Sequence, residues 1–138
     1  MNQKHVIAQV KELNLPLGQY VILGGGALAG RRIRETKDLD VLVTQDLFEK
    51  LSKTYPLDSE YEHKWKRKRL KLNNVEIYPD LYLENANLFF DVEEVIKNAE
   101  IVEGLPLQPI DNLIKCKLDS GREKDLYDVE LIKQFLSR

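Results

Sequence analysis

The chain has 138 residues, a length that fits one domain with a single hydrophobic core. Apolar residues make up 43% of the composition and charged residues 32%, which indicates a globular protein with a charged surface. The net charge of -2 excludes a general attraction to nucleic acid, so binding of that kind would need a local basic patch.

Two further absences narrow the class of protein. No apolar run approaches the ~20 residues of a membrane span, and the first residues lack the apolar core of a signal peptide. The single cysteine, Cys116, cannot form an internal disulfide, which is typical of a reducing compartment. We therefore expect one cytoplasmic domain over residues 1–138 with no membrane partner, and we interpret Cys116 as a small core residue.

The first third of the chain combines a helix, a strand and a glycine run. Apolar spacing predicts a helix over residues 2–13 and a short buried strand over residues 19–23. The strand leads into Gly24, Gly25 and Gly26, which lack a Cβ and so let backbone N–H groups approach a phosphate. A helix from Ala27 would point its N-terminus at the same anion. Taken alone, the glycine run is more typical of an ordinary turn.

Two carboxylates then stand in an apolar strand, predicted over residues 38–43. Asp38 and Asp40 are two residues apart, so they share one face of that strand, about 6–7 Å apart. Like charges this close are costly to bury without a partner, and a divalent cation would remove the cost. Carboxylate oxygens suit Mg²⁺, which binds one or two carboxylates together with substrate phosphates.

The middle of the chain predicts mixed structure. Thr44 or Asp46 caps a short helix that runs to residue 51, and residues 61–72 predict a strongly basic strand. The Asn73-Asn74 turn joins Leu70–Leu72 to Val75–Tyr78 in a hairpin. Residues 91–99 predict a helix, and residues 101–102 and 105–107 predict short extended segments.

The last third is helical. The first helix starts at Pro109, has an apolar face that includes Leu118, and ends at Gly121. The second covers residues 123–136, with Leu126 on its apolar face. Strands in the first and central parts, with helices around them and at the end, predict an α+β fold: a mixed β-sheet with flanking helices and a helical C-terminal part.

A third acid and a charged tail complete the set of candidate residues. Catalysis by two metal ions usually needs a further acid from a neighbouring strand, and Glu76 is the best candidate, with Asp80 the second. Glu76 is equally compatible with a solvent-facing position in an alternating strand. Lys117 would be useful as a point charge on phosphate oxygens, near Asp125 and Asp128 on one helix face, although such a cluster is also typical of a solvated charged face.

Two motifs in these segments resemble those of a known superfamily. The sequences LGGGALA at residues 23–29 and RETKDLD at residues 34–40 resemble the opening motif of the nucleotidyltransferases related to DNA polymerase beta. The sequence KLDSGREKDLYD at residues 117–128 resembles the closing motifs of their AbiEii-like, abortive-infection toxin branch. Together the motifs cover most of the chain from about residue 20 onward.

The resemblance implies a nucleotidyltransferase-like fold and specific residue roles. Gly24, Gly25 and Gly26 would hold the nucleotide phosphates, and Lys117 would contact the triphosphate. The acids Asp38, Asp40 and Glu76 would bind the catalytic Mg²⁺ ions, and Asp125 would help to organise the site. The chain departs from the pattern at Gly26, where a hydroxyl residue is frequent, and at Glu76, where Asp is usual.

The reaction implied is transfer of a nucleoside monophosphate from a nucleoside triphosphate to an acceptor hydroxyl. The acceptor is an RNA such as tRNA, or a partner protein in a toxin–antitoxin or defence system. The basic run at residues 63–69, with Trp65 inside it, suits an RNA backbone and base, but also a solvated edge strand. The alternative function is a nucleotide-binding or partner-binding protein of the same fold that acts as an antitoxin or regulator.

Overall fold

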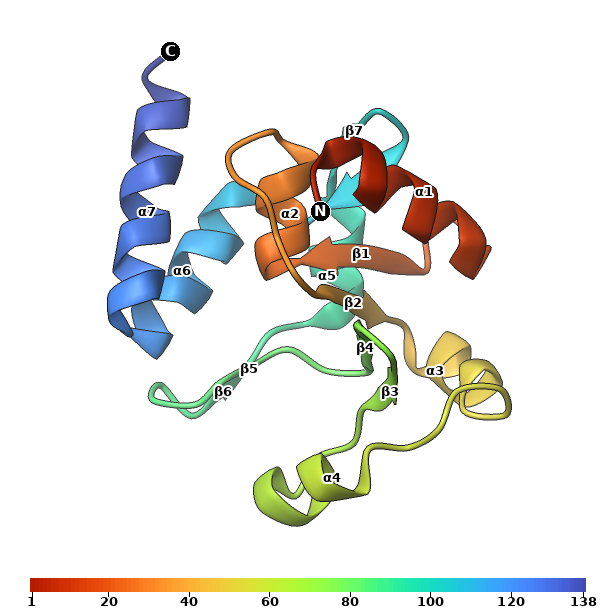
Figure 1. Cartoon of the computed structure of the whole chain (residues 1–138). Helices are drawn as coiled ribbons and strands as arrows, with labels where there is room; N and C mark the ends of the chain where they lie inside the picture. Colours follow the sequence, from red (N-terminus) through yellow and green to blue (C-terminus); the bar gives the residue numbers. More distant parts are fainter.

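The α+β class predicted from the sequence is confirmed by a computed structural model that describes all 138 residues (Figure 1). The helices are α1 (Gln3–Leu13), α2 (Gly24–Gly30), α3 (Gln45–Leu51), α4 (Ser59–Trp65), α5 (Val92–Lys97), α6 (Ile110–Ser120) and α7 (Glu123–Leu136). The strands are β1 (Tyr20–Leu23), β2 (Leu39–Val43), β3 (Leu70–Leu72), β4 (Val75–Tyr78), β5 (Tyr82–Leu83), β6 (Leu88–Phe89), β7 (Glu100–Val102) and β8 (Leu105–Leu107).

Six of the strands form one mixed sheet in the order β3-β4-β2-β1-β8-β7, and β5 and β6 form a separate two-stranded sheet. The pairs β3/β4, β1/β2 and β7/β8 are antiparallel, whereas β2/β4 and β1/β8 are parallel. The β3/β4 pair is the predicted hairpin around Asn73-Asn74. Because β2 lies between β1 and β4, the segment with the two aspartates occupies the middle of the sheet.

The sheet is covered on both faces, and successive side chains of a strand point to opposite faces. Ile22, Val41 and Ile77 belong to the larger core cluster, which also includes side chains of α1, α2 and α3. Leu42 belongs to a smaller cluster with Ile96 and other side chains of α5. Asp40 is two residues before Leu42 in β2, so it shares the α5 side of the sheet.

Local capping explains where several helices begin and end. Asn2 accepts a hydrogen bond from the backbone of His5 at the start of α1, and Thr44 does the same for Leu47 at the start of α3. Gly121, at φ +62°, ends α6 in the left-handed conformation that favours glycine. The predicted starts and ends of these helices are therefore confirmed to within one or two residues.

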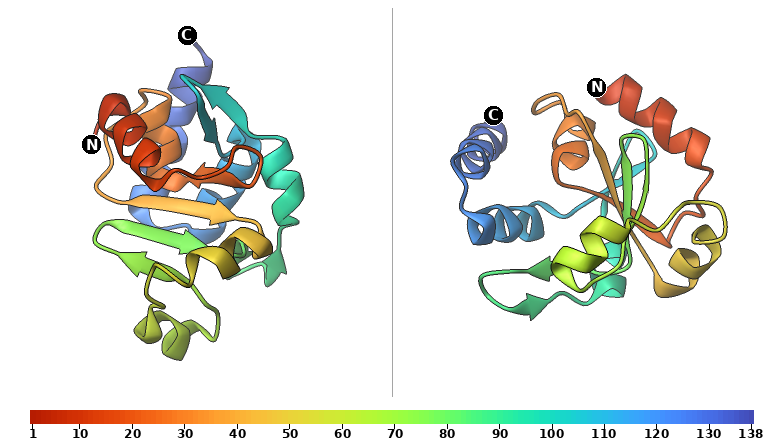
Figure 2. Two further views of the ribbon diagram at one scale, coloured as in Figure 1. Left: turned by 90° about the vertical axis from the view of Figure 1, so that its right-hand side faces the viewer. Right: turned by 60° about the horizontal axis from the view of Figure 1, so that its bottom comes forward.

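The C-terminal helices α6 and α7 pack against each other, on the side of the molecule opposite α1 (Figures 1 and 2). The buried apolar side chains of α7 are Val129 and Ile132. Leu118 and Leu126, which we predicted on the apolar faces, are instead exposed, at 54% and 47%. A helix that packs mainly on one neighbouring helix buries fewer apolar positions than its sequence periodicity predicts.

The prediction of a basic strand over residues 61–72 is wrong except for β3. Residues 59–65 form α4, whose N-cap Asp58 accepts a hydrogen bond from the backbone of Tyr61. The helix has no buried residue, so it lacks the apolar periodicity by which helices are recognised.

The glycine run differs from the prediction as well. Gly24, Gly25 and Gly26 are the first turn of α2 and do not precede it as a separate turn. Gly24 has φ +52°, a conformation that side chains with a Cβ rarely adopt. The chain therefore passes from β1 into α2 without any connecting loop.

Candidate functional site

A cavity of about 850 Å³ lies where the ends of β1 and β2 approach α6 and α7. Of the residues that we predicted for the site, those that line this cavity are Gly24, Gly25, Asp38, Asp40, Lys117 and Asp125. Glu76 and Gly26 are not part of the lining. The fold thus brings together residues that are about 100 positions apart in the sequence.

Asp40 is a carboxylate of the site that has neither a hydrogen-bond donor nor an ion-pair partner. It is half-buried in β2, opposite Leu23 on one side and Glu76 on the other. No side chain or backbone group donates a hydrogen bond to it, and it forms no ion pair. Burial raises the pKa of Asp40 to about 7, and the negative charges of Glu76 and Asp38 add to the effect.

Asp38 immediately precedes β2 and is exposed at the cavity. It also forms no ion pair, and its charge acts on Asp40. A positive ion near this pair would remove both the repulsion and the cost of burying Asp40. Asp38 and Asp40 are therefore the residues that would hold a divalent cation, and their oxygen donors suit Mg²⁺.

Glu76 is placed beside this pair but is bound to another group. It lies in β4 in register with Asp40, so the two side chains share one face of the parallel strand pair. Its carboxylate forms an ion pair with Arg69 and accepts a hydrogen bond of 3.1 Å from the hydroxyl of Tyr78. No three His, Cys, Asp or Glu side chains lie close enough together to hold one ion between them.

Asp80, the second candidate for the third acid, does line the cavity. Its carboxylate accepts a hydrogen bond of 3.0 Å from Arg67. The guanidinium of Arg67 is 4.8 Å from the ring centre of Tyr82 and 5.7 Å from that of Tyr61. Both candidate acids are thus compensated by an arginine from the segment that follows α4.

The three glycines have different environments. Gly24 donates its backbone N–H to the buried side chain of Gln108 at 2.9 Å, and a Cβ on it would approach a carboxylate oxygen of Asp40 at 4.0 Å. A Cβ on Gly25 would collide with the hydroxyl of Thr36. Gly26 is buried, and a Cβ there would lie 2.7 Å from Ile22. Gly26 therefore lets α2 pack closely on β1 and does not face the cavity.

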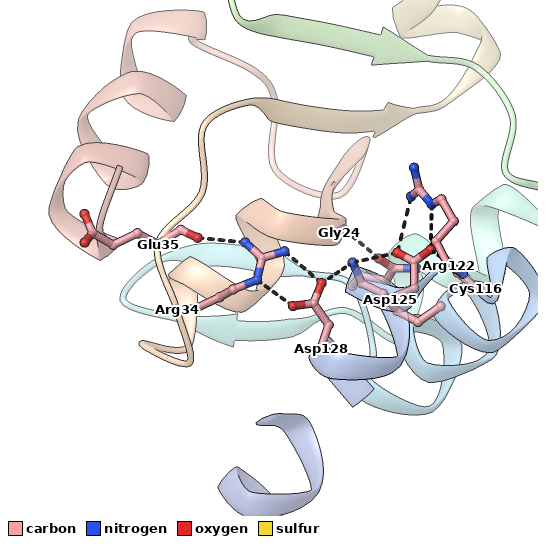
Figure 3. A network of polar contacts seen from close by, with 9 residues as sticks. Gly24, Arg34, Glu35, Cys116, Arg122, Asp125 and Asp128 are labelled. Carbon is pink, nitrogen blue, oxygen red and sulfur yellow. Dashed lines mark hydrogen bonds and ion pairs between the residues drawn. The ribbon is translucent and has the colours of Figure 1, made fainter. Parts of the chain in front are cut away.

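Lys117 lies in the cavity wall and is held by α7. Its amine donates a hydrogen bond of 2.8 Å to Asp128 and is 3.8 Å from Asp125. Arg34, from the loop between α2 and β2, donates two hydrogen bonds of 2.7 and 2.8 Å to the same Asp128 (Figure 3). Both carboxylates are nearly fully buried, and the two cations hold the pKa of Asp128 below its usual range.

Asp125 is oriented from the start of its own helix. Arg122 donates hydrogen bonds to it from its backbone and from its guanidinium, the closest at 2.7 Å (Figure 3). Lys117, Arg122, Asp125 and Asp128, which we call the tail cluster, therefore form a wall of paired charges. This wall holds the side chains of Lys117 and Arg34 at the cavity. We predicted no role for Arg34 from the sequence, although Arg34 is the first residue of the RETKDLD motif at residues 34–40.

Several aromatic residues of the cavity were not expected. Tyr61, Tyr78 and Tyr82 line it on the side of β4 and β5. Their spacing in the sequence follows no motif, and only the turn of the chain after Tyr78 brings Tyr82 to the same wall. Cys116 also lines the cavity, but burial raises the pKa of its thiol to about 11, so the thiol is protonated at neutral pH.

None of the seven helices combines the length and the apolar character that crossing a membrane requires. Comparisons of the chain with protein families, with curated proteins and with solved structures found no match.

Proposed function

We propose that the chain is a Mg²⁺-dependent nucleotidyltransferase that moves a nucleoside monophosphate from a nucleoside triphosphate to a hydroxyl of an RNA or protein acceptor. The observation that carries the proposal is Asp40. This carboxylate has no donor and no ion pair, is repelled by two neighbouring acids, and faces a cavity large enough for a nucleotide. A cation with a bound triphosphate would relieve that imbalance.

The other side chains of the cavity support the same substrate. Lys117 and Arg34 are the cations of the wall beside Gly24 and Gly25, where phosphate oxygens could be bound. Asp128 holds both cations in place before any ligand arrives, so little ordering is needed when it binds. The bound metal would supply charge stabilisation on the phosphates of the transferred group.

In the proposed reaction the acceptor oxygen forms a bond to the α-phosphorus while the bond to the pyrophosphate oxygen breaks. The hydroxyl proton passes to a carboxylate oxygen of Asp40, the carboxylate without an ion pair, and from there to solvent. The protein contributes position and charge and forms no covalent intermediate. Lys117 and Arg34 would stabilise the charge that develops on the leaving pyrophosphate.

An RNA acceptor is supported by the surface next to the cavity. Arg67 and Arg69 turn inward to Asp80 and Glu76, whereas Lys64, Lys66 and Lys68 are exposed and form no ion pair. Because residues 59–65 form a helix, the protection of a sheet edge does not account for Lys64. A partner protein, such as the other member of a toxin–antitoxin pair, is the second class of acceptor.

One specific observation favours the alternative of a nucleotide-binding regulator without transferase activity. Glu76 is already neutralised by Arg69, so the chain lacks three free carboxylates at one point. A regulator of this kind would bind the triphosphate with Mg²⁺ and leave it intact.

Transfer of label from α-³²P nucleoside triphosphates separates the two functions. The protein is incubated with each of the four nucleotides, Mg²⁺ and either total RNA or total protein of the host cell. Label in RNA or protein, lost with Asp40→Asn, is the result expected for the enzyme. Binding of the nucleotide with no label transferred in any arm would favour the regulator, and no binding at all would contradict both.

A further inference from the structure

Arg69 is the best-anchored cation next to the carboxylates of the sheet. Its guanidinium forms ion pairs with Glu76 and with Asp58, and its Nε donates a hydrogen bond of 2.8 Å to Asp58. A second donation, of 2.9 Å, goes to the hydroxyl of Tyr78, and the guanidinium stacks 4.2 Å from the ring centre of Tyr61. Four groups from β4, α4 and the residue that caps α4 therefore fix its position.

This anchoring keeps a permanent positive charge beside the candidate third acid. The side chains of Arg69 and Glu76 are 18% and 15% exposed, so water screens their pairing only in part. A guanidinium is always charged, in contrast to a histidine or a lysine that burial can neutralise. The charges that act on Asp40 are those of Glu76, Asp38, Arg69 and Lys117. The positive charge of Arg69 therefore acts on Asp40 as well as on Glu76.

The charge balance of the cluster follows directly. When ionised, Asp38, Asp40, Glu76 and Asp58 carry four negative charges, and Arg69 carries one positive charge. The wall that holds Lys117 adds one positive charge, because three cations are paired there with Asp125 and Asp128, so the sum is two negative units. One divalent cation balances that sum, whereas two would leave an excess of positive charge.

We propose that the protein binds a single divalent cation at Asp38 and Asp40, and that the guanidinium of Arg69 takes the place of a second cation at Glu76. The inference rests on the proposed function, since it concerns the cation that the substrate would share. Arg69 is a positioning residue in this scheme: it neutralises Glu76 and limits the number of ions.

The chain offers a matched control at Arg67. This arginine is two residues from Arg69, has a similar exposure of 19%, and lines the cavity, with its guanidinium 3.0 Å from Asp80 and 3.8 Å from Glu84. It is paired with Asp80 and not with Glu76, and it is not among the charges that act on Asp40. Arg67→Gln therefore removes the same charge without releasing Glu76.

Mn²⁺ serves as the probe, because the electron paramagnetic resonance signal of free Mn²⁺ reports how many ions the protein binds. The wild-type protein is expected to bind one ion per chain. Arg69→Gln should bind a second ion and hold the first roughly tenfold more tightly, because a positive charge near the site has been removed. Arg67→Gln should bind one ion with an affinity within about threefold of the wild type.

The other possible results of the Mn²⁺ titration distinguish this inference from the proposed function. Two ions in the wild type, or equal behaviour of the two glutamine variants, would overturn this inference and leave the proposed function standing. No Mn²⁺ binding in any variant would contradict the proposed cation site and this inference together. If Arg69→Gln does not fold, as judged by circular dichroism, Glu76→Gln decides. It removes the carboxylate that pairs with Arg69, so it should bind one ion roughly tenfold more weakly than the wild type, and an unchanged affinity would overturn the inference.

Discussion

At the scale of single residues, the main feature of the site is one carboxylate to which the fold supplies no hydrogen-bond donor and no ion-pair partner. Asp40 sits beside Glu76 and Asp38 with no donor of its own, whereas Asp125 and Asp128 are buried with every charge paired. Buried carboxylates are normally paired, and an unpaired one in a cavity is where a functional role is expected.

Asp40→Asn should abolish Mg²⁺ binding and stabilise the free protein at neutral and higher pH. The pKa of Asp40 is raised to about 7 in the folded state, above about 3.9 in the unfolded chain, so ionisation destabilises the fold as pH rises between these values. The gain from Asn should be largest above pH 7, at about 2–4 kcal/mol, and absent below pH 4. Urea unfolding at pH 4, 6 and 8 measures it, and calorimetry measures Mg²⁺ affinity. A gain that does not change with pH, or an unchanged Mg²⁺ affinity, would contradict this prediction.

Lys117→Ala should weaken binding of a nucleoside triphosphate by about ten- to a hundredfold, because a charge-assisted contact to phosphate is worth about 1.5–3 kcal/mol. Lys115→Ala is the matched control, since Lys115 is exposed on the same helix and forms no ion pair. Titration of both variants with the same nucleotide gives the comparison. Equal losses, or a larger loss at Lys115, would mean that the tail cluster is a solvated face.

At the scale of elements, α7 is attached to the rest of the domain partly by charge. Asp128→Ala should lower the free energy of unfolding by about 3–5 kcal/mol, because it leaves Arg34 and Lys117 facing the cavity without their shared partner. Glu130→Ala, on the same helix but 64% exposed in its ion pair with Lys133, should cost under about 1 kcal/mol. Urea unfolding of both variants measures the difference, and similar losses would show that charge pairing does not hold α7.

The first turn of α2 gives a second prediction at this scale. Gly26→Ala should destabilise the protein by about 1–3 kcal/mol, because the new Cβ would meet Ile22 at 2.7 Å and Leu39 at 3.2 Å in a filled core. The higher helix propensity of alanine would by itself favour the variant by up to about 1 kcal/mol. Thermal unfolding decides which effect is larger, and a raised melting temperature would show that the core can accommodate the methyl group.

The elements differ in how far the sequence predicted them. The hairpin β3/β4 and the helices α1, α5 and α7 carry periodic apolar positions and turn residues, which are local signals. The helix α4 carries neither, although Asp58 at its N-cap and the acidic residues of its first turn are start signals that could have identified it. The β5/β6 pair was not predicted, because two residues per strand are too few for a pattern.

The candidate site was predicted in the same uneven way. Asp38, Asp40 and Lys117 line one cavity as the motifs suggested. The pairing of Glu76 with Arg69 could not be predicted, because it depends on how the chain turns after α4 and on which of several arginines points inward. Gly26 was assigned to the phosphates from its place in the motif, but only the packing of α2 on β1 shows that it is covered.

At the scale of the whole molecule, binding and folding should be linked. A triphosphate with Mg²⁺ that binds the folded state alone, at a hundred times its dissociation constant, would stabilise it by about 2.7 kcal/mol. For a domain of 138 residues this corresponds to a rise in melting temperature of several degrees. Thermal unfolding with nucleotide alone, with Mg²⁺ alone and with both measures it. A rise with nucleotide alone that matches the rise with both would contradict a shared cation site.

The position of Asp128 has a consequence for the order in which the protein is made. Arg34 belongs to the loop after α2, yet its partner is 94 residues later, beyond every strand of the sheet. During synthesis β1, β2 and β4 leave the ribosome while Arg34 still has no carboxylate to hold it. The wall of the cavity is therefore completed only when α7 emerges, and a nascent chain that lacks α7 should not bind the proposed triphosphate.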